Sequence, residues 1–183
     1  MRKVLVVAIA SLFVTAGLAG AEEPKSGLEL GGFPSAFNVK DITGPKKGTS
    51  LCYRCAYGAR PVVAIFTREV NEDVANLVKQ IDNVVGENKE QKMSAFVILL
   101  SDDPDADEAK LAKVAEQMKI QNVPLTIFDG VAGPPEYKIS KDAAVNVMMW
   151  VKQDVKANQA FAQPKLDKET TAKIVADTKK ILE

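Results

Sequence analysis

Both cysteines of this chain lie in one Cys-x-x-Cys stretch, at Cys52 and Cys55, just before a segment with the character of a buried strand. Residues 61–66 form a continuous β-branched and aromatic run, and Pro61 stands at its first position, where a missing N–H does least harm. Unbroken apolarity predicts a strand buried on both faces, in the centre of a sheet covered by helices. The fold must therefore accommodate a central strand that starts directly after a cysteine loop.

A strongly periodic helix is predicted after this strand. Its apolar residues recur at helical spacing: Val70, Val74, Leu77, Val78, Ile81, Val84 and Val85. Thr67 or Asn71 can cap its first turn, and Gly86 is expected to end it. Residues 94–100 form a second continuous apolar run. Two such strands joined by a helix predict a right-handed βαβ unit with a parallel pair.

The flanking segments predict the rest of a single α/β domain over residues 36–183. Residues 36–42 alternate apolar and polar, which predicts a short edge strand or hairpin arm. A further helix should end near Lys119, and residues 123–130 predict a short strand or extended segment. Two apolar runs, 144–151 and 155–161, surround a polar turn and predict an antiparallel hairpin. A last helix is expected from Asp167, its cap, to Leu182.

The acidic run at 102–108 has the Asp-x-Asp-x-Asp spacing of a calcium loop at Asp103, Asp105 and Asp107. An EF-hand loop counted from Asp103 needs glycine where Glu108 stands and a bidentate glutamate where Val114 stands. The interpretation we favour is an aspartate cap, with proline and acidic residues in the first turn of the following helix.

The N-terminus has the pattern of a signal peptide. Arg2 and Lys3 precede an apolar stretch at 4–18, and small residues at 19–21 predict cleavage after Ala21. The alternative, an uncleaved anchor, is less favoured because the apolar run is short for a spanning helix. No later stretch approaches a transmembrane run, and residues 22–35, rich in glycine, proline and charge, predict a flexible leader. The expected location is the periplasm or the outside of the cell.

Composition excludes several functional classes. The chain has 24 basic and 24 acidic residues, and removal of the signal takes away only two charged residues, Arg2 and Lys3. This near balance of charge does not favour binding to nucleic acid or to an anionic membrane surface. It has no histidine, so an imidazole base, a hydrolase triad and a Cys/His zinc site are missing in their usual forms. Ala56 follows Cys55, so this is not a haem-attachment motif. We expect no cofactor.

The order of these elements resembles the thioredoxin-like superfamily over residues 37–182. It is most similar to the peroxiredoxin and alkyl hydroperoxide reductase branch and to exported thioredoxin-like proteins. Residues 37–44 resemble that branch's opening strand, 60–66 its central strand and 147–155 its later hairpin. The resemblance implies an α/β thioredoxin-like fold: a central mixed sheet with a βαβ unit and a C-terminal β-hairpin plus helix.

The chain departs from this family at the position of the reactive cysteine. That cysteine follows the central strand, where this sequence has Thr67, Arg68 and Glu69, so no peroxidatic or thioredoxin-type nucleophile carries over. The family's cis proline precedes the first hairpin strand. Pro124 matches only if residues 125–128 are that strand; we favour the hairpin beginning near Val145, which makes Pro124 an ordinary trans proline.

The placement of the cysteines follows from strand geometry. A strand rises about 3.3 Å per residue, which puts Cys55 and Thr67 at opposite ends of the central strand, roughly 20 Å apart. Functional crevices of open α/β sheets lie at the carboxyl ends of the strands. The cysteine pair is therefore expected at the other end.

Three hypotheses remain for Cys52 and Cys55. Export favours a disulfide, and a structural one would close the turn into the strand. Alternatively, the pair performs thiol–disulfide exchange from a non-standard position, with Arg54 and Arg60 favouring a thiolate and Tyr53 and Tyr57 offering a docking surface. A metal site would need two chains sharing one ion, or a linear cuprous ion.

A second class of function is a non-catalytic thioredoxin-fold module that binds a partner. Its site would be Thr67, Arg68 and Glu69, with Asp102 and Asp103 nearby, and Arg68 would hold a carboxylate or phosphate. The competing explanation is that Thr67 and Glu69 only start the helix and that Arg68 is solvated. In either class, the expected partner is another exported protein or a thiol or disulfide substrate.

Overall fold

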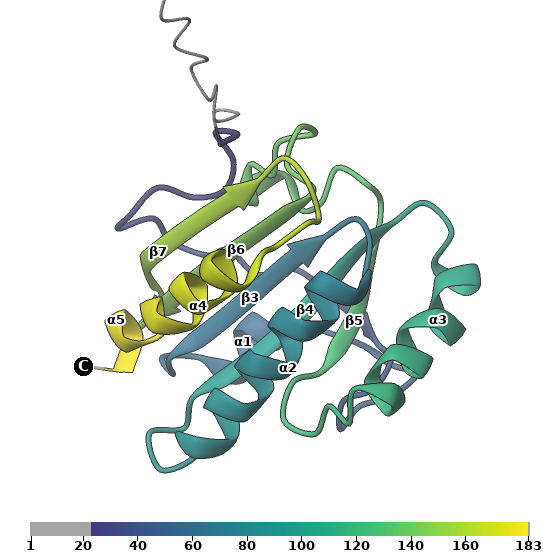
Figure 1. The fold of residues 1–183 in the computed structure, drawn as a ribbon, viewed down its shortest axis with the longest axis horizontal. Coiled ribbons are helices and arrows are strands. Elements are labelled where there is room, and N and C mark those ends of the chain that lie inside the picture. Colours follow the sequence, from purple (N-terminus) through teal and green to yellow (C-terminus); the bar gives the residue numbers. More distant parts are fainter. Residues whose placement is uncertain (1–22, 183) are drawn as a thin grey trace, which may run out of the picture.

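The computed structural model describes residues 23–182, so the predicted signal peptide lies outside the described residues. Its centre is a seven-stranded mixed sheet of order β2-β1-β5-β4-β3-β6-β7 (Figure 1). The strands are β1 Val39–Asp41, β2 Ser50–Leu51, β3 Val62–Thr67, β4 Ser94–Ser101, β5 Leu125–Asp129, β6 Val145–Val151 and β7 Asp154–Phe161. Strands β3, β4 and β5 are mutually parallel, and the other pairs are antiparallel.

The βαβ unit is confirmed. Strands β3 and β4, joined by α2 (Glu72–Glu87), pair in parallel from Val62 opposite Ser94. Asn71 is the cap of α2, since its side chain accepts the N–H of Val74 at 3.0 Å. The prediction that Gly86 ends the helix is wrong by two residues. Asn88 is the C-cap and its side-chain amide donates to Val84 O at 2.8 Å, while Gly86 lies in the last turn against Asn122.

Helices cover one face of the sheet, as Figure 1 shows: α2, α3 (Pro104–Gln117), α4 (Lys168–Asp177) and α5 (Lys179–Leu182). Asp103 provides the predicted aspartate cap of α3, and the predicted cap Asp167 is confirmed for α4. Thr178 divides the predicted last helix into α4 and α5. The core on this face is mainly aliphatic, built from alternate residues of β3, β4 and β6 together with Leu77, Ile81 and Ile174.

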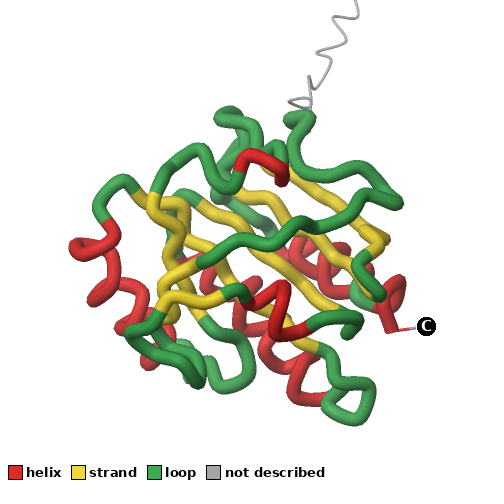
Figure 2. The backbone as a smooth tube through the Cα atoms, turned by 180° about the vertical axis from the view of Figure 1, so that it is seen from behind, coloured by secondary structure: helices red, strands yellow, loops and turns green. Residues whose placement is uncertain are grey.

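The other face carries an aromatic core under loops and short helices. Figure 2 shows the N-terminal chain crossing this face beside α1 (Tyr53–Tyr57), and the 3-10 helix η1 (Pro135–Tyr137) also packs here. Phe37 packs against Phe66, Phe96 and Tyr137, with ring centroids 4.8 to 6.2 Å apart. Helix α1 is an element that the sequence did not predict.

Strand β1 confirms the hairpin-arm alternative for residues 36–42. It is three residues long and lies between β2 and β5, so the short β2 forms the outer edge of the sheet. The strand ends at Asp41 because the Asp41 side chain turns into the following loop and accepts the N–H groups of Gly44 and Lys46.

The C-terminal hairpin is confirmed, with β6 paired to both β3 and β7. Its turn consists of Lys152 and Gln153, which have positive φ angles of 53° and 64°. Two consecutive residues with positive φ are typical of the two-residue hairpin turn whose twist matches that of the flanking strands. Asparagine and glycine adopt this conformation most easily. Pro124 is trans and precedes β5, as the favoured alignment requires.

Residues 23–35 contain no helix or strand, yet they are bound to the hairpin. Gly31 donates its N–H to Val155 O at 2.9 Å, and the N–H of Val155 reaches Gly32 O at 3.1 Å. Leu28 is buried in the aromatic core. Composition predicts a flexible leader here and gives no sign of these contacts. Within residues 23–182, no helix has the length and apolarity needed to cross a bilayer.

Candidate functional site: the disulfide on helix α1

Cys52 and Cys55 form a disulfide in the first turn of α1. Cys52 is the N-cap of this helix, and its Sγ accepts the N–H of Cys55 at 3.1 Å. The backbone also closes the turn, because the N–H of Ala56 reaches Cys52 O at 3.0 Å. Cys55 is exposed and Cys52 is partly buried.

Tyr53, between the two cysteines, anchors α1 in the protein interior. It is 3% exposed, and its hydroxyl donates to Asp41 Oδ2 at 2.7 Å. Burial, and then the Asp41 carboxylate, raise the pKa of the Tyr53 phenol. Gly44 permits this approach, since a side chain there would collide with the Tyr53 hydroxyl. The helix that carries the disulfide is thus fixed to the turn after β1.

Tyr53 and Tyr57 both pack on Phe96 of β4, with ring centroids 5.6 and 6.0 Å away. Burial removes Tyr53 from the docking surface that the sequence suggested for these two tyrosines. Tyr53 is buried core, whereas Tyr57 is half-buried, and its hydroxyl donates to Ala95 O at 3.3 Å.

Arg54 joins three segments beside the disulfide. Its Nε donates to Pro34 O at 2.6 Å, and its Nη2 donates to the side chain of Gln153 in the hairpin turn at 2.5 Å. The guanidinium lies 4.7 Å from the ring centre of Phe33, which is 60% exposed. An exposed aromatic side chain therefore lies against a fixed cation that belongs to the same helix as the disulfide.

Helix α1, which carries the disulfide, leads into the start of β3. The chain runs from α1 into β3, and Ala59 O in the connecting loop accepts the N–H of Lys152 in the hairpin turn. Thr67 ends β3, paired with Leu99 and Val145. The cysteines and the Thr67–Arg68–Glu69 position therefore belong to different regions of the molecule.

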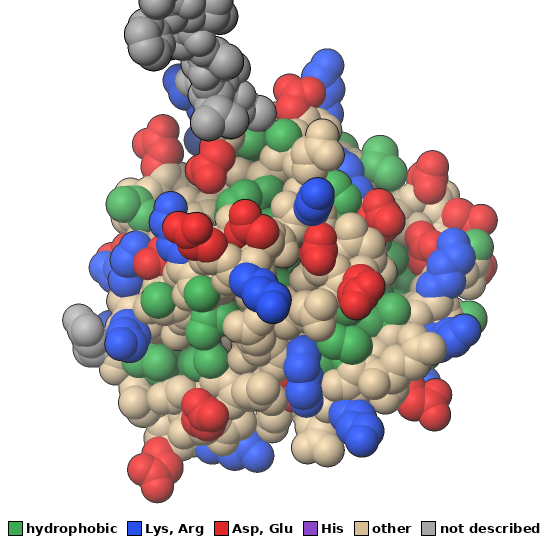
Figure 3. Space-filling model, viewed as in Figure 1, with side chains coloured by type: hydrophobic (Ala, Val, Ile, Leu, Met, Phe, Trp, Pro, Cys, Tyr) green, Lys and Arg blue, Asp and Glu red, His purple; other side chains and the backbone are tan. Residues whose placement is uncertain are grey.

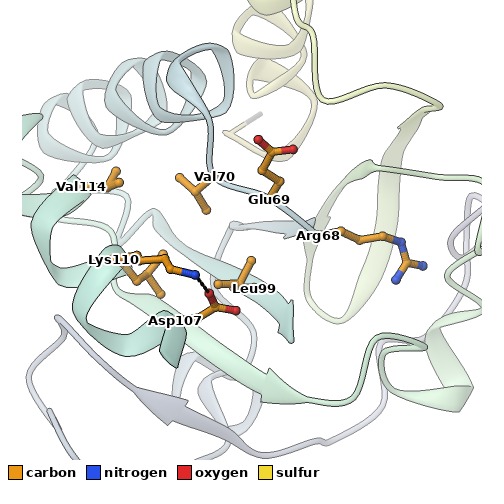
Figure 4. Close-up of a pocket in the computed structure, with 8 residues that line it drawn as sticks. Arg68, Glu69, Val70, Leu99, Asp107, Lys110 and Val114 are labelled. Carbon is orange, nitrogen blue, oxygen red and sulfur yellow. Dashed lines mark hydrogen bonds and ion pairs between the residues drawn. The ribbon is translucent and has the colours of Figure 1, made fainter. Parts of the chain in front are cut away.

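The second region is a cleft of about 390 Å³ where β3 and β4 end, beside α3 (Figure 4). Its lining residues are Arg68, Glu69, Val70, Leu99, Asp107, Lys110, Leu111 and Val114. Lys110 donates to Asp107 at 2.9 Å, and Asp107 also accepts the Ser101 hydroxyl. These two bonds lower the pKa of the Asp107 carboxyl.

Arg68 borders this cleft but points away from it. Figure 4 shows its guanidinium directed away from the Asp107–Lys110 pair. Its three nitrogens donate to the carbonyls of Ala143, Ser140 and Val131. The expectation of a solvated Arg68 is therefore wrong, and much of its capacity to hold an anion is already taken by backbone.

The neighbouring residues have structural contacts. The hydroxyl of Thr67 donates to Glu69 O at 2.6 Å, so Thr67 shapes the loop before α2 while Asn71 provides the cap. Asp103 accepts the N–H of Ala106 at the start of α3, and Asp102 is exposed. Within residues 23–182, no cluster of three or more histidine, cysteine, aspartate or glutamate side chains suits a metal ion.

The surface seen in Figure 3 carries basic and acidic side chains interspersed over the helical face. No large region of one sign is visible in this view. The face offers no strong electrostatic attraction for a highly charged polymer.

Comparison with known proteins supports the fold. No family model matches the sequence, and no curated protein matches it. A candidate protein disulfide isomerase from Bacteroides thetaiotaomicron superimposes with a TM-score of 0.64 and 13% identity, covering 86% of this chain and 93% of its own. The Xanthomonas campestris bacterioferritin comigratory protein superimposes with a TM-score of 0.61 and 11% identity, covering 86% of this chain and 99% of its own. Peroxidoxin BcpB from Mycobacterium tuberculosis superimposes with a TM-score of 0.57 and 20% identity, covering 83% of this chain and 97% of its own.

Together, the sheet order, the βαβ unit and these structures define a thioredoxin-like fold, which confirms the predicted fold class. At such identities the likeness establishes the fold and no activity. The disulfide is one of the alternatives that the sequence left open for Cys52 and Cys55, whereas the sequence did not predict the Tyr53–Asp41 bond or the Arg54–Phe33 contact. The signals for them were slight: a tyrosine and an arginine between the cysteines, and an aspartate in a short alternating strand.

Proposed function

We propose that this protein carries out thiol–disulfide exchange through Cys52 and Cys55. The observation that carries the proposal is an exposed disulfide on a short helix that is itself held in place by buried contacts. A disulfide exchanges only when a thiolate can reach one of its sulfurs, and Cys55 is accessible. The thioredoxin-like fold and the name of the Bacteroides thetaiotaomicron neighbour agree with this function.

The substrate would be a thiol or disulfide of another exported protein. The signal-like sequence at 1–21 supports an oxidising compartment, the periplasm or the cell exterior, as the place of action. Exposed Phe33, which lies against Arg54 of the same helix as the disulfide, would give a substrate an apolar contact. N-terminal sequencing of the protein recovered from fractionated cells tests export; a cytosolic protein that keeps residue 1 contradicts it.

The deciding experiment is a redox titration of the pair in dithiothreitol buffers, followed by alkylation and mass measurement. Exchange activity requires a reduction potential above about −300 mV, the range of exposed and labile disulfides. Insulin reduction by the protein should then be lost in Cys52→Ser. Resistance to mild dithiothreitol, with only a modest loss of stability in that variant, contradicts the proposal and leaves a structural disulfide.

A second candidate is a non-catalytic binding module, and the cleft beside α3 is the observation that favours it. Its floor is apolar, at Leu99, Leu111 and Val114, and Lys110 stands at its rim. We suggest the anionic dye anilinonaphthalene sulfonate as a probe of such a cleft. Dye fluorescence that saturates with the folded protein and weakens in Lys110→Glu supports binding here; no saturable signal contradicts it.

A further inference from the structure

We infer that Cys55 Sγ is the sulfur that forms the mixed disulfide with a substrate, and that Cys52 Sγ is the sulfur that leaves. This assignment rests on the exchange function proposed above. It deepens that function by giving the two cysteines different roles.

The two sulfurs differ first in access. Cys55 is exposed, and Ala56 after it is exposed as well. Cys52 follows β2 and is partly buried between Leu51, also partly buried, and Tyr53, which is 3% exposed. Thiol–disulfide exchange depends on which sulfur an incoming thiolate can reach. Cys55 is therefore the more exposed cysteine of the pair and the one that an incoming thiolate reaches more easily.

The two sulfurs also differ as leaving groups. Cys52 Sγ accepts the N–H of Cys55 at 3.1 Å, and among the hydrogen bonds of residues 23–182 none reaches Cys55 Sγ. A donor directed at a sulfur favours its thiolate form, and a sulfur with a lower thiol pKa leaves faster. Attack on Cys55 expels Cys52, the better leaving group, whereas attack on Cys52 expels the sulfur without a donor.

The geometry around Cys52 Sγ does not depend on the disulfide. The N–H of Ala56 holds Cys52 O at 3.0 Å, and the Tyr53–Asp41 bond fixes α1 to the turn after β1. These contacts involve neither sulfur. The N–H of Cys55 thus stays near Cys52 Sγ once the S–S bond is broken, where it stabilises the thiolate that has just formed.

We infer that the substrate is a protein with two thiols, because two thiolates are needed to reduce the Cys52–Cys55 disulfide completely. A substrate thiolate attacks Cys55 Sγ, a new S–S bond forms, the Cys52–Cys55 bond breaks, and its electron pair goes to Cys52 Sγ. The second substrate thiolate then attacks the substrate sulfur of the mixed disulfide and releases Cys55 as a thiolate. Protons from the two substrate thiols pass to the two cysteines. The substrate is oxidised and the protein disulfide is reduced, by two electrons in each case.

The test uses the oxidised wild-type protein, with reduced glutathione as the attacking thiol. The reaction is quenched with an alkylating agent at early times, and tandem mass spectrometry locates the mixed disulfide. In parallel, the remaining thiols of Cys52→Ser and Cys55→Ser are titrated by the pH dependence of their alkylation, which gives the thiol pKa of each cysteine. The fluorescence of Trp150, the single tryptophan, reports whether both variants are folded.

We expect the glutathione adduct on Cys55, and a lower thiol pKa in Cys55→Ser than in Cys52→Ser, because Cys52 Sγ accepts the N–H of Cys55. An adduct mainly or equally on Cys52, or a thiol pKa in Cys55→Ser that is not the lower of the two, overturns the assignment and leaves the exchange function standing. A wild-type disulfide that neither glutathione nor dithiothreitol opens overturns the proposed function itself. The adduct mapping needs no variant, so a variant that fails to fold does not remove the test.

Discussion

The hydroxyl of Tyr53 lies 2.7 Å from Oδ2 of Asp41, a carboxylate with no exposed surface. Asp41 has two other partners, the N–H groups of Gly44 and Lys46 at 2.6 and 2.8 Å. Three hydrogen-bond donors offset the cost of burying the Asp41 carboxylate, and the loss of one donor leaves part of that cost uncompensated. The bond connects the helix that carries the disulfide to the turn after β1.

Tyr53→Phe is therefore expected to reduce the free energy of unfolding by about 2 kcal/mol, the usual effect of losing a hydrogen bond to a charged group. Urea unfolding followed by Trp150 fluorescence measures the change. Tyr57→Phe is the matched control, because its hydroxyl bonds a neutral carbonyl, Ala95 O, at 3.3 Å and should matter by less than about 1 kcal/mol. Equal losses in the two variants contradict this role of Tyr53.

Arg68 holds the segment between β5 and β6 to the end of β3 through three carbonyls, those of Val131, Ser140 and Ala143. Arg68→Ala leaves these carbonyls without the guanidinium, so we expect a loss of roughly 2 to 3 kcal/mol in stability. Faster amide hydrogen exchange over residues 131–144 should accompany it.

Glu69→Ala is the neighbouring control for Arg68→Ala. Glu69 is exposed, and such substitutions usually change stability by less than about 0.5 kcal/mol. Unchanged exchange over residues 131–144 in Arg68→Ala indicates that the guanidinium does not hold this segment. The anion-binding role of Arg68 then becomes the better explanation for its position.

The sequence predicts most of the framework because the signals for it are local. Continuous apolar runs identify β3 and β4, and helical spacing identifies α2. The caps Asn71, Asp103 and Asp167 each act within three residues of their own position. The local sequence preferences of these strands, of α2 and of the caps agree with the tertiary structure, so the local pattern is enough to predict them.

The candidate site is less predictable because its contacts join distant parts of the chain. Helix α1 has five residues, too few to show an apolar period, and it is held by packing on Phe96 and by the bond to Asp41. Arg68 reaches carbonyls 63 to 75 positions away. Nothing in the local sequence specifies such partners, so the pattern located the cysteines but not the helix that presents them.

Gly27 provides a test of how tightly residues 23–35 are attached. It has a φ of +87°, and a Cβ there would collide with the side-chain amide of Asn158. Asn158 also donates to Ser26 O at 2.7 Å and accepts from Asn146, which is buried. Gly27→Ala should therefore disturb this polar network as well as strain the backbone, reducing the free energy of unfolding by about 2 to 3 kcal/mol.

Gly31→Ala separates the two effects. Gly31 has a φ of +81°, and a methyl group added there would meet nothing within 4 Å, so only the backbone strain of about 1 kcal/mol applies. A larger loss for Gly27→Ala, measured by urea unfolding, supports a packed N-terminal segment. Identical losses indicate that the contact with Asn158 contributes nothing to stability.

The three tyrosines, Tyr53, Tyr57 and Tyr137, are the whole tyrosine content of the chain, and burial raises the pKa of each phenol above its ordinary value. In the unfolded chain a phenol ionises near about pH 10. A group whose pKa is raised in the folded state adds stability that is fully present below the unfolded pKa and is lost as the pH rises toward the folded one. The free energy of unfolding should therefore fall with pH above about pH 10.

Tyrosinate absorbance in the near ultraviolet checks this directly. The folded protein should show no step near about pH 10, and the urea-unfolded protein should show the full step there. Because lysines also titrate in this range, Tyr57→Phe serves as the control for stability: its loss of stability with pH should be shallower than that of the wild type, since one coupled phenol has been removed. A full tyrosinate step near about pH 10 in the folded protein would mean that these phenols are open to solvent, and the aromatic core beneath α1 would then not be packed as described.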